Sequence, residues 1–392
     1  MRYAPHRTFA PPRRHHAIVF NSLRTAYPES PQRGSGTLDV GCGHRLSWRE
    51  YGARDGVPAL VVHGGPGAAC FPSHARWFDP DRYRVVLLDQ RGCGASTPLG
   101  SLEHNTTDDL VSDIEALRNE LGVDAWVLLG GSWGVTLALA YACAHPQAVR
   151  GIILRAVCLF RQQEIDWAYR GGAAAIYPGS WQHFKAQVGA TRADDDPLAL
   201  AHALLTGADA SARARAAAAW HGLGAALSVP LPADGVQVWR GGPGSAWVKL
   251  QQADTLGGTA AVEMARAGDR LHRAVPAEPV SQQSADSPAT AASAMTTGEA
   301  QAVLEAHYCY HAGFSLADVP LLERVATLRH ARIPIVAIHG RCDLLCPVAN
   351  AYDLHTALPD MELRIVGGAG HSQYNPGIAH ELVCATDAFR VL

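Results

Sequence analysis

The chain has 392 residues, 48% of them apolar and 18% charged, which is enough for one large domain with an inserted module. Its formal net charge of −3 and pI of about 6.7 offer no bulk basicity to attract nucleic acid or an anionic membrane, so neither is expected as a partner. Nine scattered cysteines favour free thiols in a reducing compartment over a disulfide framework or a zinc site.

Residues 1–28 differ in composition from the rest of the chain, because they hold five arginines and no acidic residue. We expect them to be a disordered N-terminal extension, since three prolines work against a long amphipathic helix. An organelle transit peptide is the alternative. No secretory apolar segment precedes the fold, so the expected location is the cytoplasm, or an organelle if residues 1–28 are a transit peptide.

From residue 29 to residue 157, apolar strand-like runs alternate with helical patterns. Apolar residues of the segment 107–121 recur on one helical face, and Thr107 is the expected N-cap. The charge-free stretch 125–144 is long enough to suggest a membrane span, but GGSWG interrupts it, so we expect a strand, a tight turn and a buried helix. The expected strands are 44–51, 59–63, 84–89, 126–129 and 152–154, and the expected helices are 107–121 and 135–144.

The same alternation returns from residue 328 to the end of the chain, with strands expected at 333–339 and 362–366 and a closing helix at 378–392. Short turns between strands and helices predict a mostly parallel, doubly wound sheet. Between its two halves, residues 158–327 read as an inserted, mainly helical cap. Within the cap, residues 281–298 contain mostly Ala, Ser and Thr, which predicts a disordered loop that is dispensable for folding.

The motif Gly130-Gly131-Ser132-Trp133-Gly134 follows an apolar strand and precedes an Ala- and Leu-rich helix. In a G-x-S-x-G turn of this kind, the residues two before and two after the serine must be small. The strain lifts the serine Oγ above the sheet at a helix N-terminus. Ser132 is therefore the candidate nucleophile.

A second glycine-rich motif, His63-Gly64-Gly65-Pro66-Gly67, comes directly after the strand ALVV. Glycines here allow a backbone N–H group to point into the site. The N–H groups of Gly65 and Trp133 are the expected oxyanion hole.

A serine nucleophile needs a base and an acid, and both are expected on loops that follow strands. Asp343 comes after the strand IPIVAI, and His371 lies on a small-residue loop after ELRIV. The carboxyl ends of strands are where open α/β sheets place their sites. The order Ser, Asp, His along the chain is that of the α/β-hydrolase fold, so Ser132, Asp343 and His371 form the predicted catalytic triad. No cofactor and no metal ion is expected.

Several segments together resemble prolyl iminopeptidase (proline iminopeptidase), a family of α/β-hydrolase exopeptidases that remove N-terminal proline from peptides. They are HGGPG, DQRGCG, NTTDDLVSDIEALR, GGSWG and HGRCDLLCP. The resemblance covers roughly residues 23–170 and 307–392. It implies a peptide substrate with N-terminal proline and gives no indication of oligomeric state.

The resemblance also implies roles for residues of the substrate pocket. Glu305 in EAHYCY matches an acidic residue that binds the free amine, and Arg155 matches an arginine beneath the pocket. Trp167 and Tyr169 correspond to the apolar floor of the cap, and Cys346 to a cysteine near the pyrrolidine ring. A proline ring needs an apolar slot, and an imino cation needs a desolvated carboxylate.

The chain departs from the family where a second amine-binding acid is usual, since the best match is Trp220-His221-Gly222. His221 therefore takes the acid's place, or another acid such as Glu263 enters the site. The segment between His221 and Glu305 is also longer than in the family. Two other functions stay open: an esterase or amidase for small acyl substrates, and a non-catalytic binding protein.

Overall fold

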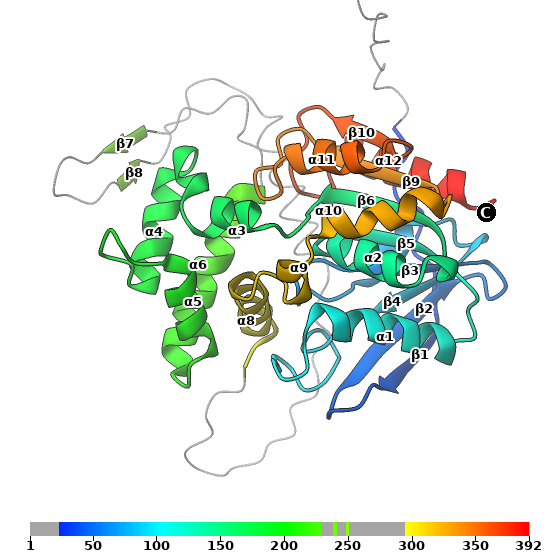
Figure 1. The fold of residues 1–392 in the computed structure, drawn as a ribbon, viewed down its shortest axis with the longest axis horizontal. Helices are drawn as coiled ribbons and strands as arrows, with labels where there is room; N and C mark the ends of the chain where they lie inside the picture. Colours follow the sequence, from blue (N-terminus) through cyan, green and yellow to red (C-terminus); the bar gives the residue numbers. More distant parts are fainter. Residues whose placement is uncertain (1–22, 229–237, 241–247, 251–294, 392) are drawn as a thin grey trace, which may run out of the picture.

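The structure, a computed structural model, describes residues 23–228, 238–240, 248–250 and 295–391. An eight-stranded sheet forms its centre, in the order β1-β2-β4-β3-β5-β6-β9-β10 (Figure 1). The strands are β1 (Gln32–Asp39), β2 (Arg45–Gly52), β3 (Val57–Val62), β4 (Tyr83–Leu88), β5 (Trp126–Ser132), β6 (Val149–Val157), β9 (Ile335–Gly340) and β10 (Glu362–Val366).

The sheet is mostly parallel, which confirms the predicted fold class. Strands β4, β3, β5, β6, β9 and β10 pair in parallel, whereas β1 and β2 form an antiparallel edge. Strand β1 was not predicted. Its sequence QRGSGTLD is rich in Gly and Ser and its residues are largely exposed, so it lacks the apolar pattern that indicates a strand.

Both faces of the sheet are buried, as in a doubly wound fold. Leu60 and Val62 of β3 belong to the core on one face, and Ala59 and Val61 to the core on the other. Helices α1 (Thr107–Glu120), α2 (Trp133–Ala144) and α11 (Ala349–Ala357) contribute to the first core, and α12 (Pro376–Phe389) contributes to the second. The near-continuous apolar runs of β3 to β5 follow from this two-sided burial.

The N-cap of α1 differs from the prediction by one residue. Thr106, not Thr107, caps the helix, and it forms a reciprocal capping box with Asp109. Thr107 is buried and donates its hydroxyl to the carbonyl of Gly313, 2.8 Å away. Two adjacent threonines are equivalent candidates in sequence, and only the tertiary contact separates them.

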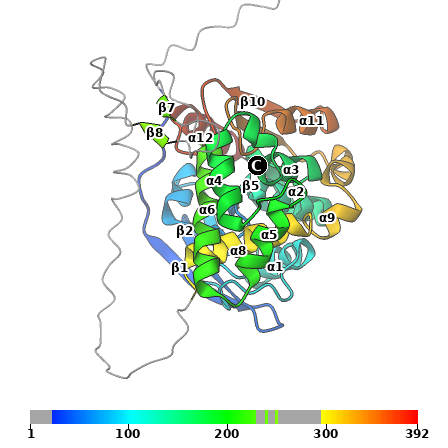
Figure 2. The ribbon, with the colours of Figure 1, turned by 90° about the vertical axis from the view of Figure 1, so that its left-hand side faces the viewer.

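The cap lies on one side of the sheet and consists of α3 (Gln162–Tyr169), α4 (Pro178–Val188), α5 (Pro197–Thr206), α6 (Ala210–Ser228) and α8 (Thr297–Tyr310) (Figures 1 and 2). The short helices α9 (Ser315–Asp318) and α10 (Leu321–Arg324) lead back to the sheet, and α10 packs on α2. Strands β7 (Val238–Arg240) and β8 (Val248–Leu250) pair with each other.

Two predictions of disorder concern residues that lie mainly outside the described ranges. These are the disordered extension 1–28, of which 1–22 is not described, and the low-complexity loop 281–298, of which 281–294 is not described. At its C-terminal end the predicted loop is too long, because Thr297 and Gly298 already belong to α8. Thr296 caps this helix and pairs with Glu299, a local signal that outweighs the segment's composition.

The charge-free stretch 125–144 folds as β5, a tight turn and α2, as expected. Across the ranges that the structure describes, no helix is long and apolar enough to cross a membrane.

Candidate active site

Ser132 is the last residue of β5 and immediately precedes α2, with φ 58° and ψ −125°. This strained conformation requires neighbours without a Cβ atom: one on Gly130 would collide with the carbonyl of Gly134, and one on Gly134 with that of Val62. The Ser132 hydroxyl makes no capping hydrogen bond to α2. It is therefore not engaged in holding the turn.

Asp343 and His371 lie on the loops that follow β9 and β10, and they are hydrogen-bonded. His371 Nδ1 is 2.8 Å from Asp343 Oδ2, while Asp343 Oδ1 accepts from the N–H groups of Leu345 at 3.1 Å and Cys346 at 2.9 Å. A carboxylate facing Nδ1 holds the proton on that nitrogen. His371 Nε2 is then left with the free lone pair that a general base needs.

The surroundings of Asp343 keep it ionised, although its side chain is buried. Burial acts to raise the pKa of Asp343, but the charge of His371 and the hydrogen bonds to His371 and Cys346 outweigh burial, so the pKa lies below its usual range. Nearby, His339 Nδ1 accepts from the N–H of Val157 at 2.9 Å, so its Nε2 donates to the carbonyl of Cys346 at 2.9 Å. Burial lowers the pKa of His339, consistent with this neutral form.

The loop that carries His371 is fixed from two sides. Arg155 Nη1 donates to the His371 carbonyl at 2.7 Å, and the His371 N–H donates to the carbonyl of Ser228 at 3.1 Å. Arg155 comes from β6 and Ser228 is the last residue of α6, so one contact ties the histidine to the sheet and the other ties it to the cap. Burial lowers the pKa of Arg155.

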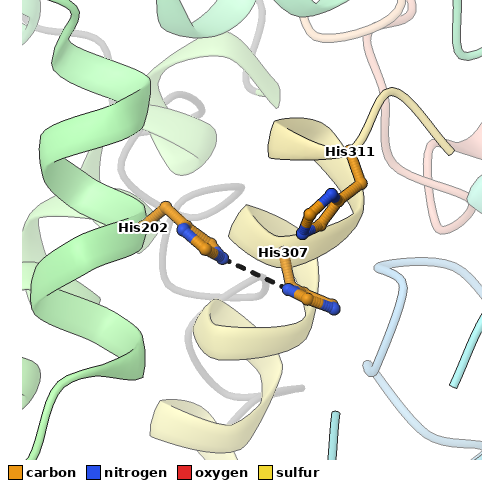
Figure 3. A group of neighbouring side chains, drawn as sticks. All are labelled: His202, His307 and His311. Atoms are coloured by element: carbon orange, nitrogen blue, oxygen red, sulfur yellow. Dashed lines mark hydrogen bonds between the residues drawn. The ribbon is translucent and has the colours of Figure 1, made fainter. Parts of the chain in front are cut away.

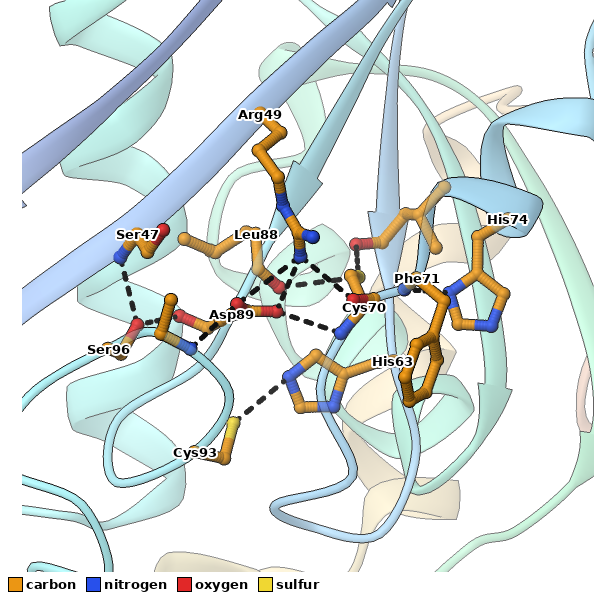
Figure 4. Close-up of polar contacts among 12 residues, drawn as sticks. Ser47, Arg49, His63, Cys70, Phe71, His74, Leu88, Asp89, Cys93 and Ser96 are labelled. Atoms are coloured by element: carbon orange, nitrogen blue, oxygen red, sulfur yellow. Dashed lines mark hydrogen bonds and ion pairs between the residues drawn. The ribbon is translucent and has the colours of Figure 1, made fainter. Parts of the chain in front are cut away.

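Asp89 connects the glycine-rich loop after β3 to the loop after β4 (Figure 4). Its buried carboxylate accepts from the N–H of Cys70 at 2.8 Å, from the N–H of Ala95 at 3.0 Å and from Arg49 Nη2 at 3.2 Å. Arg49 Nη2 also donates to the carbonyl of Cys70 at 2.8 Å. The Asp89 carboxylate, paired with Arg49, thereby holds both loops.

Gln90 extends this network to the two segments expected to form the oxyanion hole. Its side-chain nitrogen donates to the His63 carbonyl at 3.0 Å, and its side-chain oxygen accepts from Trp133 Nε1 at 3.1 Å. The Gln90 N–H donates to His63 Nε2 at 3.1 Å. The N–H of Trp133 is the first of α2, where N–H groups have no partner within the helix.

The cap places Glu305 of α8 against aromatic residues of α3 and α6. Trp220 Nε1 donates to Glu305 Oε2 at 2.6 Å, and Gln301 Nε2 donates to Oε1 at 2.8 Å. Tyr169 stacks on Trp220, with ring centroids 3.9 Å apart and an interplanar angle of 11°. Burial raises the pKa of Glu305. The hydrogen bonds from Gln301 and Trp220 and the charges of His221 and His371 act to lower it, but burial outweighs them.

Three further predicted pocket residues have clear positions. Trp167 Nε1 donates to the Leu344 carbonyl at 2.7 Å, which joins α3 to the loop of Asp343. Cys346 is buried, and a hydrogen bond with the Cys158 thiol, together with burial, raises its pKa well above the usual range. His221 Nε2 lies 2.9 Å from the Gly298 carbonyl, to which it donates. That contact holds α6 to α8, and an amine-binding role for His221 stays a prediction.

Comparison with known proteins gives the family. The family described as alpha/beta hydrolase fold matches residues 58–375. A proline iminopeptidase of Arabidopsis thaliana is 39% identical over 381 residues, covering 96% of this chain and 85% of the relative. One of Neisseria gonorrhoeae is 36% identical over 354 residues, covering 90% and 95%. The chain belongs to the proline iminopeptidase family of α/β hydrolases.

Solved structures agree with this proline iminopeptidase family at the level of the fold. The proline iminopeptidase of Mycobacterium smegmatis has a TM-score of 0.53 and 16% identity, with 91% of this chain and 99% of that chain covered. A proline iminopeptidase-related protein of Thermus thermophilus has a TM-score of 0.53 and 20% identity, with coverage of 92% and 98%.

In this member of the proline iminopeptidase family, sequence reasoning missed Gln90 and Gln301. Gln90 belongs to the quoted motif DQRGCG, so the family signal was present without an assigned role. Gln301 lies one helical turn before Glu305 on α8, and this i, i+4 spacing was the available signal.

We expect Gln90→Met to lower kcat by about tenfold while KM changes less than about twofold. Methionine fills a similar volume but removes the hydrogen bonds to the His63 carbonyl and Trp133 Nε1, which position the glycine-rich loop and the serine turn. Steady-state kinetics with proline naphthylamide provide the measurement. Gln182→Met, on the exposed side of α4, is the matched control. Equal kcat values for Gln90→Met and the control would show that Gln90 does not position the site.

Proposed function

We propose that the chain is a prolyl aminopeptidase, a serine exopeptidase that releases N-terminal proline from peptides through an acyl-enzyme. The observation that carries this proposal is the Asp343–His371 hydrogen bond, in a chain whose β5–α2 turn holds Ser132 in a strained conformation and whose cap holds Glu305 partly buried. Relatives named proline iminopeptidase, at 36–39% identity over most of the chain, support the same function.

In the proposed mechanism, Ser132 attacks the carbonyl of the N-terminal proline and His371 Nε2 takes the hydroxyl proton. Asp343 keeps the imidazole in the reactive tautomer and stabilises the imidazolium. The N–H groups of Gly65 and Trp133 stabilise the negative oxygen of the tetrahedral intermediate. His371 then protonates the leaving amine, and water releases proline from the acyl-enzyme by the same steps in reverse.

Glu305 is the proposed partner of the proline imino cation. Two donors hold its carboxylate, from Trp220 and Gln301, and neither of them carries a positive charge. A bound cation would supply the missing countercharge, which offsets the cost of burying the carboxylate. The stacked Tyr169 and Trp220 rings and the buried Cys346 provide the apolar surroundings that a pyrrolidine ring needs.

The same proposal assigns positioning roles to the remaining residues. Arg155 fixes the His371 loop, and Trp167 fixes the loop that carries Asp343. His221 holds α6 against α8 through the Gly298 carbonyl. None of the nine cysteines forms a disulfide bond, which favours a reducing compartment such as the cytoplasm.

Glu305→Gln tests the substrate class. We expect kcat/KM for proline naphthylamide to fall by roughly 30- to 1000-fold, because a charged hydrogen bond to the imino cation is worth about 2–4 kcal/mol at such a site. Hydrolysis of a p-nitrophenyl ester without an amine should change little. Glu323→Gln, at an exposed position of α10, is the matched control.

The pH dependence gives an independent readout of the same residue. Because burial raises the pKa of Glu305, its carboxylate protonates at a higher pH than an exposed glutamate does. KM for proline naphthylamide should therefore rise as the pH falls through that raised value, and Glu305→Gln should remove this limb. A wild-type enzyme that prefers the ester, with Glu305→Gln affecting both substrates alike, supports the alternative of an esterase or amidase.

A further inference from the structure

Three histidines meet between two helices of the cap (Figure 3), and none of them belongs to the proposed triad or to the predicted substrate pocket. His202 lies in α5 and His307 lies in α8. His311 is the C-cap residue of α8. One ring nitrogen from each histidine lies within 4.8 Å of the others. His202 Nε2 and His307 Nδ1 are 3.2 Å apart.

The local structure explains why these side chains converge. His307 and His311 are four residues apart, so they lie on the same face of α8, the spacing by which helices present two histidines to one metal ion. Helix α5 packs directly against α8 and supplies the third ring. Tyr310 stacks on His202 at 4.3 Å between centroids, and Phe314 stacks on His311 at 5.2 Å. These contacts already restrain the His202 and His311 rings, so binding a metal ion would cost little further side-chain entropy.

We propose that His202, His307 and His311 bind a divalent transition-metal ion of the zinc class, which joins α5 to α8. Nitrogens bonded to a tetrahedral zinc at 2.0–2.1 Å lie about 3.3–3.4 Å from each other, close to the 3.2 Å between His202 Nε2 and His307 Nδ1. Imidazole suits zinc, copper and nickel, and three histidines leave a fourth position for water.

The ring nitrogens of this cluster are available for coordination near neutral pH. Burial lowers the pKa of His202, and burial with the neighbouring His311 and His202 lowers that of His307 to about 4. Both rings are neutral near pH 7, which is the form that ligates metals. The ordinary alternative is a neutral hydrogen bond between His202 and His307 with no metal ion, and the experiment separates the two.

The test uses the full chain, stripped with a chelator and titrated first with Co²⁺ and then with Zn²⁺. We expect one tight site that shows the intense visible absorption of tetrahedral Co²⁺, and Zn²⁺ should displace it. Saturation with Zn²⁺ should raise Tm by roughly 3–5 °C, because the ion binds only the folded arrangement of the two helices.

Variants connect the signal to these residues. His202→Asn and His311→Asn should each weaken Co²⁺ binding by roughly 100-fold or more, with the Tm increase lost. His183→Asn, at an exposed position of α4, is the matched control and should bind as the wild type does. Because the chain has 19 histidines, binding that persists unchanged in both cluster variants would place the metal elsewhere and overturn the proposal. Absence of a tetrahedral Co²⁺ spectrum in the wild type would overturn it even without the variants.

Discussion

Replacing Ser132 with alanine is expected to lower kcat for proline naphthylamide by about four orders of magnitude or more, with little change in KM. The hydroxyl is the only group removed, and it makes no capping hydrogen bond to α2, so the turn keeps its structure. Alanine also tolerates the unusual backbone conformation as well as serine does. The loss therefore reports chemistry and not folding.

A fluorophosphonate probe gives a second measurement for Ser132, because it labels only a serine that a base has activated. The wild type should be labelled once, and Ser132→Ala should not be labelled. Ser112→Ala, which removes an exposed hydroxyl of α1, is the matched control and should leave both labelling and kcat unchanged. A wild-type chain that binds proline peptides but is neither labelled nor active would instead support the non-catalytic binding protein.

Asp343→Asn is expected to lower kcat by about four orders of magnitude while the fold is preserved. The asparagine oxygen can still accept from the N–H groups of Leu345 and Cys346, as Oδ1 of Asp343 does. Its NH₂ group then faces His371 Nδ1 and donates to it. This moves the imidazole proton to Nε2, where the ring can no longer accept the proton of Ser132.

The control for Asp343→Asn is Asp360→Asn, a change of the same kind at an exposed position after α11. Steady-state kinetics and Tm should be measured for both variants. If Asp343→Asn keeps near-full activity, another carboxylate orients His371. If it loses Tm as well as activity, the two N–H contacts have not been preserved and the effect on kcat does not isolate the tautomer.

The core elements and the positions of the three proposed triad residues could be predicted from sequence because their signals are local. A run of apolar residues marks each strand, small residues mark the turn at Ser132, and Asp343 and His371 each follow a strand directly. Strand β1 escaped prediction because it is largely exposed and lacks apolar alternation.

The cap was less predictable because its site depends on contacts between helices far apart in sequence. The Tyr169–Trp220 stack and the meeting of His202 with His307 arise from packing of separate helices, which no spacing rule reveals. The four-residue spacing of His307 and His311 was readable from the sequence, but the third ring, His202, was not, so no metal site was predicted in the cap. Glu263, the alternative amine-binding acid, lies outside the described ranges, so its entry into the site stays a prediction.

The pairing of β6 with β9 bears on how the molecule folds during synthesis. Ile152 and Ile335 are neighbours in the sheet, yet roughly 180 residues of chain, including the whole cap, separate them. The entropy of closing so long a loop makes this a late step on the folding pathway. A nascent chain therefore completes the β5–α2 turn of Ser132 long before Asp343 and His371 are synthesised, so the proposed triad can assemble only near the end of translation.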